Sequence, residues 1–324
     1  MTSSYKGCLI GLAVGDALGA PVEFLTLVQL RAKYGATGIE DYEPWDDFEP
    51  GSYTDDTQLS LAAAQGCLDA YREHRATGRW EVRAAVYREY QKWRRSQKNP
   101  MNRKSPGLTC LLALEGDHMG TIDNPLNDSK GCGGVMRTAP AGLVFKPDAA
   151  FRAGAEFAAM THGHPSGYLS AGFLSELIAR LLEERSLSRS INRTLPVLKS
   201  YAGHEETLDK IKLALRLSSL AGTSAGVIRR IGQGWVGEEA LGISLYCALK
   251  YRGDFRAGVL AAVNHGGDSD STGSITGAIL GTSLGLEAIP KDWVGRLQNR
   301  NMILDLASAL EESFGTSGRV DFTN

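Results

Sequence analysis

The sequence predicts an all-α protein, and three observations support this prediction. Along most of the 324 residues, apolar side chains recur with the 3.6-residue period of an amphipathic helix. Asn-Gly and Asp-Gly hairpin turns are absent, and no βα unit repeats. Two separate segments carry a glycine at every fourth position, which places the four glycines of each segment on one helix face.

Helices are expected wherever this period is sustained. In residues 81–95, the apolar face consists of Val82, Ala85, Val86, Tyr90 and Trp93. The same pattern predicts helices over residues 57–74, 81–95, 149–160, 167–184, 205–217, 237–251, 255–263 and 302–314. Stretches rich in Gly, Pro, Asn and Asp predict loops over residues 39–53, 96–106 and 117–134. No linker separates zones of different composition. We therefore expect one domain over residues 1–314 and a frayed tail over residues 315–324.

The glycine repeats suggest which helices lie at the centre. The repeats are Gly7, Gly11, Gly15 and Gly19 near the start, and Gly273, Gly277, Gly281 and Gly285 near the end. A glycine inside a helix costs about 1 kcal/mol relative to alanine, so four on one face suggest that another backbone comes very close. We expect the two segments to pair at the centre of the domain. The alternative is two unrelated glycine-rich helices, each packed on a different neighbour.

The composition excludes several classes of protein. Lys and Arg total 35 and Asp and Glu total 37, so the net charge is −2 and gives no bulk electrostatic reason to bind nucleic acid or an anionic membrane. The five cysteines are scattered, which argues against a disulfide framework and a cysteine-rich zinc site. The N-terminus lacks a signal-peptide pattern, and no window reaches 18 consecutive apolar residues. We therefore expect a cytoplasmic protein.

Two acidic clusters precede predicted helices and are the strongest candidates for a site. One contains Thr54, Asp55 and Asp56, and the other contains Asp268, Asp270 and Ser271. Their ligand atoms are all oxygens, which favour Mg²⁺, Mn²⁺ or Ca²⁺ over zinc. Two such clusters could hold two ions, as in binuclear hydrolytic sites.

Helix capping is the alternative explanation, because Asp, Ser and Thr are good N-cap residues. It would suffice for either cluster alone. It explains Asp55 and Asp56 less well, because a single cap needs only one carboxylate.

Three further elements could contribute to a site, and each also has a plain structural explanation. The glycines of residues 131–134 could present backbone N–H groups to an anion, or form an ordinary tight turn. His162 and His164 could bind a metal, or hydrogen-bond locally at a helix end. Glu23 lies among apolar neighbours that could raise its pKa for acid–base work, or it could be a surface residue after a proline turn.

Taken together and in this order, these elements resemble the ADP-ribosylglycohydrolase family. The similarity extends from residue 7 to residue 286 and includes the motifs GCLIGLAVGDALGAPVEF, GSYTDDTQ, SPGLT, GCGGVMRTAP, THGHP and HGGDSDSTG. The resemblance implies a single orthogonal all-α domain with a binuclear Mg²⁺ or Mn²⁺ centre. The metal ligands that it implies are Thr54, Asp55, Asp56, Asp268, Asp270 and Ser271. Ser271 departs from the family, which often has Thr there, and so loses a methyl group that restricts χ1.

The resemblance also implies roles for the other elements. Glu23 matches an acidic residue near the ribose, and we assign it a catalytic role together with Asp55 and Asp56. His162 matches a residue near the ADP-ribose. The residues that match the diphosphate-binding loop are Gly131, Gly133, Gly134, Val135 and Met136.

The implied reaction is hydrolysis of the bond between ADP-ribose and a modified protein side chain, with ADP-ribose as the product. An acidic rim over residues 40–49 would suit a cationic guanidinium, so ADP-ribosyl-arginine is the expected substrate. Serine-linked and O-acetyl-ADP-ribose are alternatives. So are a catalytically silent ADP-ribose-binding protein and, from another class, a binuclear phosphatase. Reversal of a regulatory modification and immunity against an ADP-ribosyltransferase toxin would both use this reaction.

Overall fold

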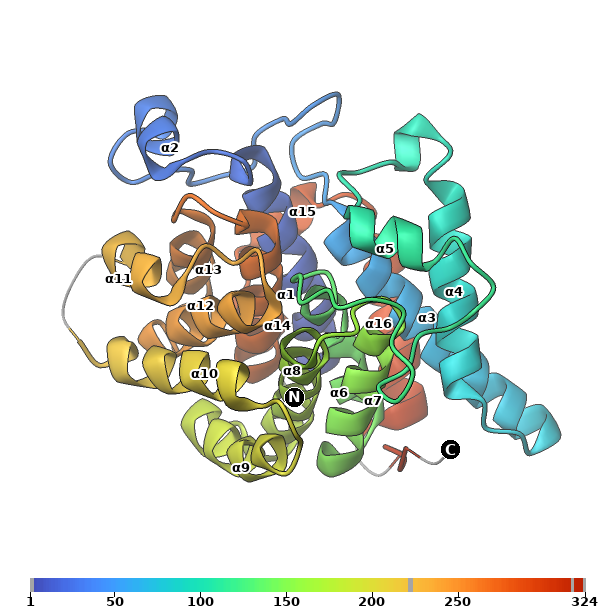
Figure 1. The fold of residues 1–324 in the computed structure, drawn as a ribbon. Helices are drawn as coiled ribbons and strands as arrows, with labels where there is room; N and C mark the ends of the chain where they lie inside the picture. The colour runs from blue at the N-terminus through green and yellow to red at the C-terminus, as the bar shows by residue number, and fades with distance from the viewer. Residues whose placement is uncertain (1–2, 221–223, 316–317, 323–324) are drawn as a thin grey trace.

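The computed structural model describes residues 3–220, 224–315 and 318–322, and its regular structure there is entirely helical (Figure 1). The α-helices are α1 (Ser4–Gly19), α2 (Leu27–Tyr34), α3 (Asp55–Thr77), α4 (Val82–Ser96), α5 (Leu108–Ala113), α6 (Ala139–Val144), α7 (Pro147–Ala159), α8 (Pro165–Glu184), α9 (Leu187–Lys199), α10 (Glu205–Ser218), α11 (Ser224–Ile231), α12 (Gly237–Lys250), α13 (Phe255–Val263), α14 (Ser269–Leu284), α15 (Lys291–Arg296) and α16 (Arg300–Phe314). Short 3₁₀ helices are η1 (Ala20–Val22), η2 (Pro100–Asn102), η3 (Val135–Arg137) and η4 (Leu286–Ala288). The prediction of an all-α fold is confirmed.

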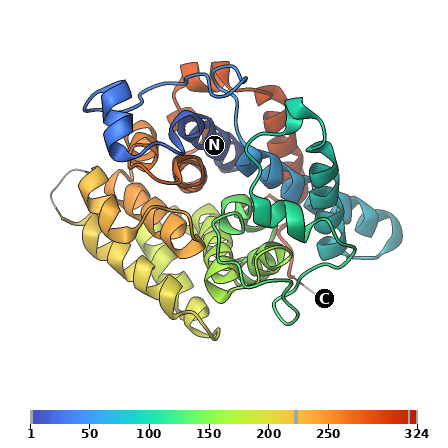
Figure 2. The ribbon, with the colours of Figure 1, turned by 45° about the horizontal axis from the view of Figure 1, so that its top comes forward.

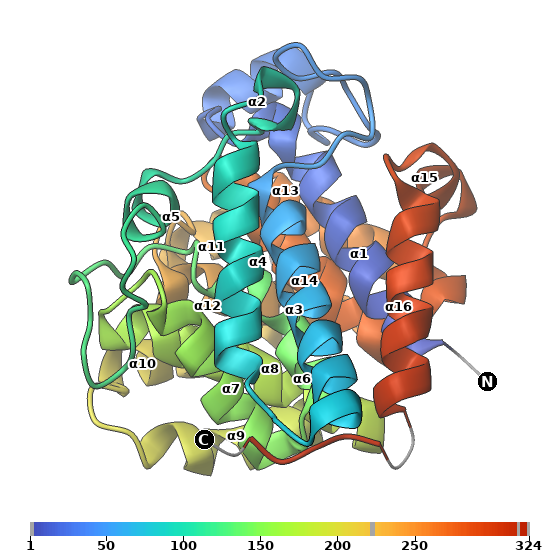
Figure 3. The ribbon, with the colours of Figure 1, turned by 90° about the vertical axis from the view of Figure 1, so that its right-hand side faces the viewer.

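The two glycine-ridged helices, α1 and α14, form the central pair (Figures 1 and 3). A Cβ atom added at Gly11 would lie 2.3 Å from the Gly277 carbonyl oxygen, and one added at Gly277 would lie 2.0 Å from the Gly11 oxygen. Gly15 meets Gly273 in the same way. Only glycine permits this approach, so the predicted central pair is confirmed. Gly7 lies against Gly281 and Gly19 against Ser269, so the two helices run antiparallel.

Other helices cover this pair from several sides. In Figure 3, α4, α3, α1 and α16 follow one another from left to right, with α14 behind; α3 and α16 both contact α1. Elsewhere in the bundle, α7 packs against α8, α10 packs against α12, and α13 packs against α14; Figure 2 shows these green, yellow and orange helices from another side. The antiparallel arrangement brings the last turn of α1 beside the first turn of α14. The first turn of α3 joins them, because Asp16 of α1 accepts hydrogen bonds from Thr54 and Thr57.

All eight helices expected from periodicity are present, with no boundary shifted by more than three residues. The short helices α2, α5, α6, α11 and α15 were missed, because six to eight residues give too little periodicity to detect. The longer helix α9 (Leu187–Lys199) was missed as well. Residues 117–130 are irregular, as expected, whereas η2 occupies part of the predicted loop at 96–106.

The expectation of a frayed tail is wrong for the part that the structure describes. Phe322 is buried, and its ring centroid lies 5.4 Å from that of Phe145. The Val320 backbone pairs with Phe145 and accepts a hydrogen bond from Lys146 N. Residues 318–322 are therefore docked on α6 and α7. The aromatic Phe322 and the β-branched Val320 make this contact. Two residues are too few to produce a periodic pattern in the sequence.

Among the described residues, no single helix has the length and apolarity needed to cross a membrane. The pair α1 and α2 meets those criteria only together, with a bend of 93° between the helices. Nearly every residue of α1 is buried inside the protein.

Candidate active site

A cavity of about 150 Å³ lies where the first turns of α3 and α14 meet the end of α1. Its wall includes Glu23, Asp55, Asp56, Asp268 and Asp270. The remaining wall is formed by Ser105, Gly107, Leu108, Thr109, Cys110, Gly131, Cys132, Gly133, Met136, His162 and Ser271. The structure therefore brings together both acidic clusters, the glycine segment, Glu23 and His162, which are up to 248 positions apart in the sequence.

The first acidic cluster begins helix α3. Thr54 is the N-cap, and its hydroxyl accepts a hydrogen bond from Asp56 N at 3.3 Å. The capping explanation therefore holds for Thr54 but not for the two carboxylates that follow it. Asp55 Oδ2 accepts from Gly107 N at 3.2 Å, whereas Asp56 Oδ1 is buried and has no hydrogen-bond partner. An orphaned buried carboxylate oxygen is costly unless something positive binds it.

The second acidic cluster begins helix α14. Asp268 is the N-cap and accepts from Ser271 N, while Asp270 also accepts from Ser271 N, at 2.9 Å. The Cys132 thiol donates to Asp268 Oδ2 at 2.7 Å. Capping thus accounts for Asp268 alone, and Asp270 faces the cavity with the first cluster.

Asp16 is a positioning residue that the sequence analysis missed. Its buried carboxylate accepts from Thr54 N at 2.8 Å, Thr57 N at 2.9 Å and Thr57 Oγ1 at 2.6 Å. It thereby fixes the start of α3 to the central helix. Its position one residue after Gly15, inside an otherwise apolar helix, was the available signal.

The carboxylates raise one another's pKa. Burial is the main cause, and the negative charge of Asp270 is the second cause for Asp16, Glu23, Asp55, Asp56 and Asp268. The pKa of Glu23 rises to about 11 and that of Asp16 to about 7, while the pKa values of Asp55, Asp56 and Asp268 rise well above the ordinary range. The group can be fully ionised at neutral pH only when positive charge enters the cavity.

The donor set fits a hard divalent cation, although the side chains do not form a closed cage. Within residues 3–220, 224–315 and 318–322, no three His, Cys, Asp or Glu side chains converge closely enough to hold an ion as they stand. The carboxylate oxygens that share the cavity, the hydroxyls of Thr54 and Ser271, and the orphaned oxygen of Asp56 are nevertheless the ligand chemistry that Mg²⁺ and Mn²⁺ prefer.

The glycine segment packs over His162. Cβ atoms added at Gly131 and Gly133 would lie 3.3 Å and 3.0 Å from the imidazole ring. Burial and the Arg137 charge lower the pKa of His162 to about 3, so the ring is neutral. Thr161 Oγ1 accepts a hydrogen bond from Arg137 and shares a second hydrogen bond, 2.8 Å long, with His162 Nδ1.

Not every backbone group of this segment is free for an anion. Gly131 N donates to Ser129 Oγ, and Cys132 N donates to the Trp235 carbonyl. Val135 is fully buried within η3, and Met136 is nearly so. Gly134 packs against Ala158 and the Gly167 carbonyl. Gly133 is therefore the best-placed glycine to face a ligand in the cavity.

The acidic loop of residues 40–49 contributes no residue to the wall of the cavity. Asp41 instead pairs with Arg296 and accepts from Trp293 Nε1. Asp46 and Asp47 are exposed. The expectation that this loop forms an acidic rim of the site is therefore not supported. Any preference for a cationic acceptor must come from other residues.

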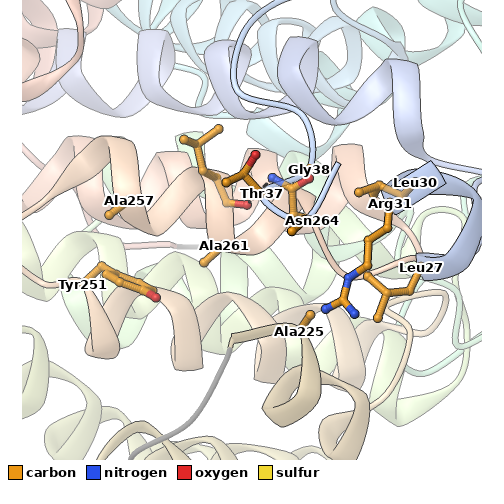
Figure 4. Close-up of a pocket in the computed structure, with 12 residues that line it drawn as sticks. Leu27, Leu30, Arg31, Thr37, Gly38, Ala225, Tyr251, Ala257, Ala261 and Asn264 are labelled. Carbon is orange, nitrogen blue, oxygen red and sulfur yellow. Dashed lines mark hydrogen bonds between the residues drawn. The ribbon is translucent and has the colours of Figure 1, made fainter. Parts of the chain in front are cut away.

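A second cavity of about 290 Å³ lies between α2, α13 and the start of α11 (Figure 4). Leu27, Leu30, Leu260 and Ala261 form part of its apolar wall, and the Arg31 side chain reaches along it. None of the cavity carboxylates described above lines it.

Comparison with known proteins gives a consistent result over the whole chain. A sequence model of the ADP-ribosylglycohydrolase family matches residues 1–319. The chain is 26% identical to the ADP-ribosyl-[dinitrogen reductase] glycohydrolase of Rhodospirillum rubrum, over 90% of this chain and 89% of the relative. It is 28% identical to the ADP-ribosylarginine hydrolase Tri1 of Serratia proteamaculans, over 94% and 78%. A solved structure described as an ADP-ribosylglycohydrolase-related protein complex matches with a TM-score of 0.73 and 25% identity, covering 97% of this chain and 98% of the other.

Proposed function

Since the chain belongs to the ADP-ribosylglycohydrolase family, whose members hydrolyse the ADP-ribose glycosidic bond, we propose that it removes ADP-ribose from modified arginine side chains of proteins with the help of two Mg²⁺ or Mn²⁺ ions. The observation that carries this proposal is the cavity in which two carboxylate pairs, Glu23 and the glycine segment meet. A catalytically silent binding protein would not need this concentration of buried carboxylates, which opposes folding in the absence of a cation.

The residues that would hold the ions are Thr54, Asp55, Asp56, Asp268, Asp270 and Ser271. Bound divalent ions supply Lewis acidity and a template for the ribose hydroxyls and water. Asp16 keeps the first of these clusters in register with the second, because it ties α3 to α1.

Glu23 is the residue best placed to move a proton. It lines the cavity, and its carboxylate accepts a 3.4 Å hydrogen bond from the Ser105 hydroxyl. In hydrolysis, a water oxygen forms a bond to C1 of the ribose, and the bond from C1 to the acceptor atom breaks with its electron pair going to that atom. The water proton is taken up by Glu23 and ends on the leaving group.

The remainder of ADP-ribose has room beside the catalytic cavity. A cavity of 150 Å³ accommodates a ribose but not a whole dinucleotide-like ligand. A neighbouring cavity of about 420 Å³ shares Thr109 with it, and its wall combines the apolar Leu112, Ala113 and Leu126 with polar residues. We place the adenosine there and the diphosphate between the two cavities, near Gly133 and His162.

Two observations favour an arginine acceptor over serine. The wall of the catalytic cavity contains five carboxylates and no Lys or Arg, so it favours a cationic substrate group. One similar protein is named as an ADP-ribosylarginine hydrolase. Another is the ADP-ribosylhydrolase ARH3 of Bos taurus, at 24% identity, whose name specifies no acceptor. Serine-linked and O-acetyl-ADP-ribose are the competing substrates.

The test is incubation with arginine- and serine-ADP-ribosylated proteins, with Mg²⁺ or with EDTA, followed by mass analysis of both products. We expect intact ADP-ribose and unmodified arginine, only with Mg²⁺. Release of AMP or phosphate instead would indicate a phosphatase-type reaction and refute the proposal. Faster release from serine would refute only the choice of acceptor. Toxin immunity and reversal of a regulatory modification both remain compatible with this activity.

A further inference from the structure

Two solvent-exposed aromatic side chains stack on each other near the mouth of the catalytic cavity. The rings of Phe24 and Trp235 lie 5.8 Å apart, centre to centre, with an angle of 16° between their planes. Phe24 is 71% exposed and Trp235 is 38% exposed. Large aromatic side chains are normally covered when they serve only the fold, so an exposed stacked pair is typical of a binding surface.

Chain connectivity and backbone hydrogen bonds hold the two aromatic residues near the carboxylates of the cavity. Phe24 directly follows Glu23, which lines the cavity. On the other side, the Trp235 carbonyl accepts a hydrogen bond from Cys132 N at 3.1 Å, and the Gln233 carbonyl accepts from Asp268 N at 2.8 Å. The segment that carries Trp235 is thus tied both to the glycine segment and to the second acidic cluster.

This position separates the aromatic pair from the adenosine. The cavity assigned to adenosine is lined by a different set of residues, on α5 and in the loop before Gly131. Neither Phe24 nor Trp235 is among them. Of the parts of an ADP-ribosylated protein, the one that must lie beside the carboxylates and yet extend outward is the acceptor side chain.

We propose that Phe24 and Trp235 form the binding surface for the acceptor side chain, and that the guanidinium group of the modified arginine stacks on it. This inference rests on the proposed function. A planar, weakly hydrated guanidinium stacks well on an aromatic face, and tryptophan is the best partner. The cavity carboxylates add attraction for the same cation. The hydroxyl-derived link of a serine acceptor has neither a charge nor a flat face, so the pair discriminates between the two.

The experiment compares Trp235→Ala, Trp235→Phe and Phe24→Ala with the unmodified protein. Met302→Ala is the matched control, because Met302 is an exposed apolar residue of α16 outside both cavities. For arginine-linked substrate, we expect Trp235→Ala to raise KM about tenfold, the change that about 1.4 kcal/mol of cation–π interaction corresponds to. Trp235→Phe should restore most of the affinity. For serine-linked substrate, KM should change less than twofold.

Calorimetric binding in EDTA provides a readout that does not depend on turnover. Trp235→Ala should weaken the binding of ADP-ribosyl-arginine but not that of free ADP-ribose, which has no acceptor. An equal loss for both ligands would show that the pair holds the nucleotide and would overturn the inference, as would an unchanged KM. Absence of cleavage by the unmodified protein would instead refute the proposed function, and the two failures are thereby distinguishable.

Discussion

At the residue scale, the chemistry of this protein depends on acidic groups that destabilise one another. Asp270 lies at the centre of this effect, because its charge raises the pKa of Glu23, Asp55, Asp56 and Asp268. Carboxylates with such strongly raised pKa values cluster at functional sites. We therefore expect the site to destabilise the fold without metal and to stabilise it when the proposed ions are bound.

The first prediction concerns Asp270→Asn. We expect the variant to be more stable than the parent in EDTA, because the repulsion among the remaining carboxylates falls. Its melting temperature should no longer rise when Mg²⁺ is added, and its turnover should be lost. Thermal denaturation with EDTA or Mg²⁺ measures this, with Asp305→Asn on the exposed side of α16 as the control. A normal Mg²⁺-dependent rise in Asp270→Asn would contradict the account.

The second prediction concerns His265, which is buried with Nε2 2.9 Å from Thr272 Oγ1. Burial lowers its pKa to about 4 from an ordinary value of 6.5, so the unfolded state binds more protons between these values. His265 therefore makes the free energy of unfolding fall as pH drops from about 6.5 to about 4, by up to about 3 kcal/mol. Above pH 6.5 this contribution is fully present.

We expect His265→Gln to remove the part of the pH-dependent fall in the free energy of unfolding that His265 causes. The glutamine amide retains a hydrogen-bond donor for Thr272. Urea unfolding at several pH values measures the slope, and the exposed His118→Gln is the control. An unchanged difference in stability between pH 7 and pH 4.5 would argue against a neutral buried imidazole.

At the scale of elements, the glycine ridges of α1 and α14 determine where the two acidic clusters meet. Close backbone contact fixes the register of the pair, since Gly11 faces Gly277 and Gly15 faces Gly273. That register places Asp270 beside the end of α1, where Asp16 positions α3. If α14 were shifted along α1 by one helical turn, the two acidic clusters would be displaced by about 5 Å relative to each other.

The third prediction tests this contact. Gly277→Ala puts a methyl group 2.0 Å from the Gly11 carbonyl oxygen, so backbone must move. We expect a loss of about 3 kcal/mol in the free energy of unfolding. Gly253→Ala is the matched control, because nothing lies within 4 Å of a Cβ atom there. Equal denaturation midpoints for the two variants would show that the central contact is looser than described.

The elements also show how far the sequence could predict the structure. Glycines at every fourth position identified the central pair, because only close helix packing explains them. The clusters at Asp55 and Asp268 were recognised because both precede helices.

Asp16 was missed, because its role depends on a contact with Thr54, which is 38 positions away. The orientation of the loop at residues 40–49 was also beyond the sequence, because its direction is set by the pairing of Asp41 with Arg296. The Phe24–Trp235 pair depends on a similar long-range contact.

At the scale of the whole molecule, the C-terminal segment packs against helices from the middle of the chain. Phe322 fills a space beside Phe145 and Phe157, with ring centroids 5.4 Å and 6.3 Å away. Phe145 directly follows α6, and Phe157 lies in α7; both helices pack against α8, which begins three residues after His162.

The fourth prediction follows from this packing. Phe322→Ala should lower the free energy of unfolding by about 3 kcal/mol, because it leaves a cavity among aromatic side chains. Chemical denaturation measures the change, with Phe24→Ala as a control for an exposed phenylalanine. A change within about 0.5 kcal/mol, typical of surface positions, would show that the tail contributes nothing to the fold.

The central claim is that the first turns of α3 and α14 together hold divalent cations. Titration of the metal-stripped protein with Mn²⁺, followed by electron paramagnetic resonance, tests it most directly because it needs no substrate. We predict two bound ions per chain, with affinity reduced at least about tenfold by either Asp55→Asn or Asp270→Asn. Absence of binding at millimolar Mn²⁺, or binding that neither substitution weakens, would contradict the account.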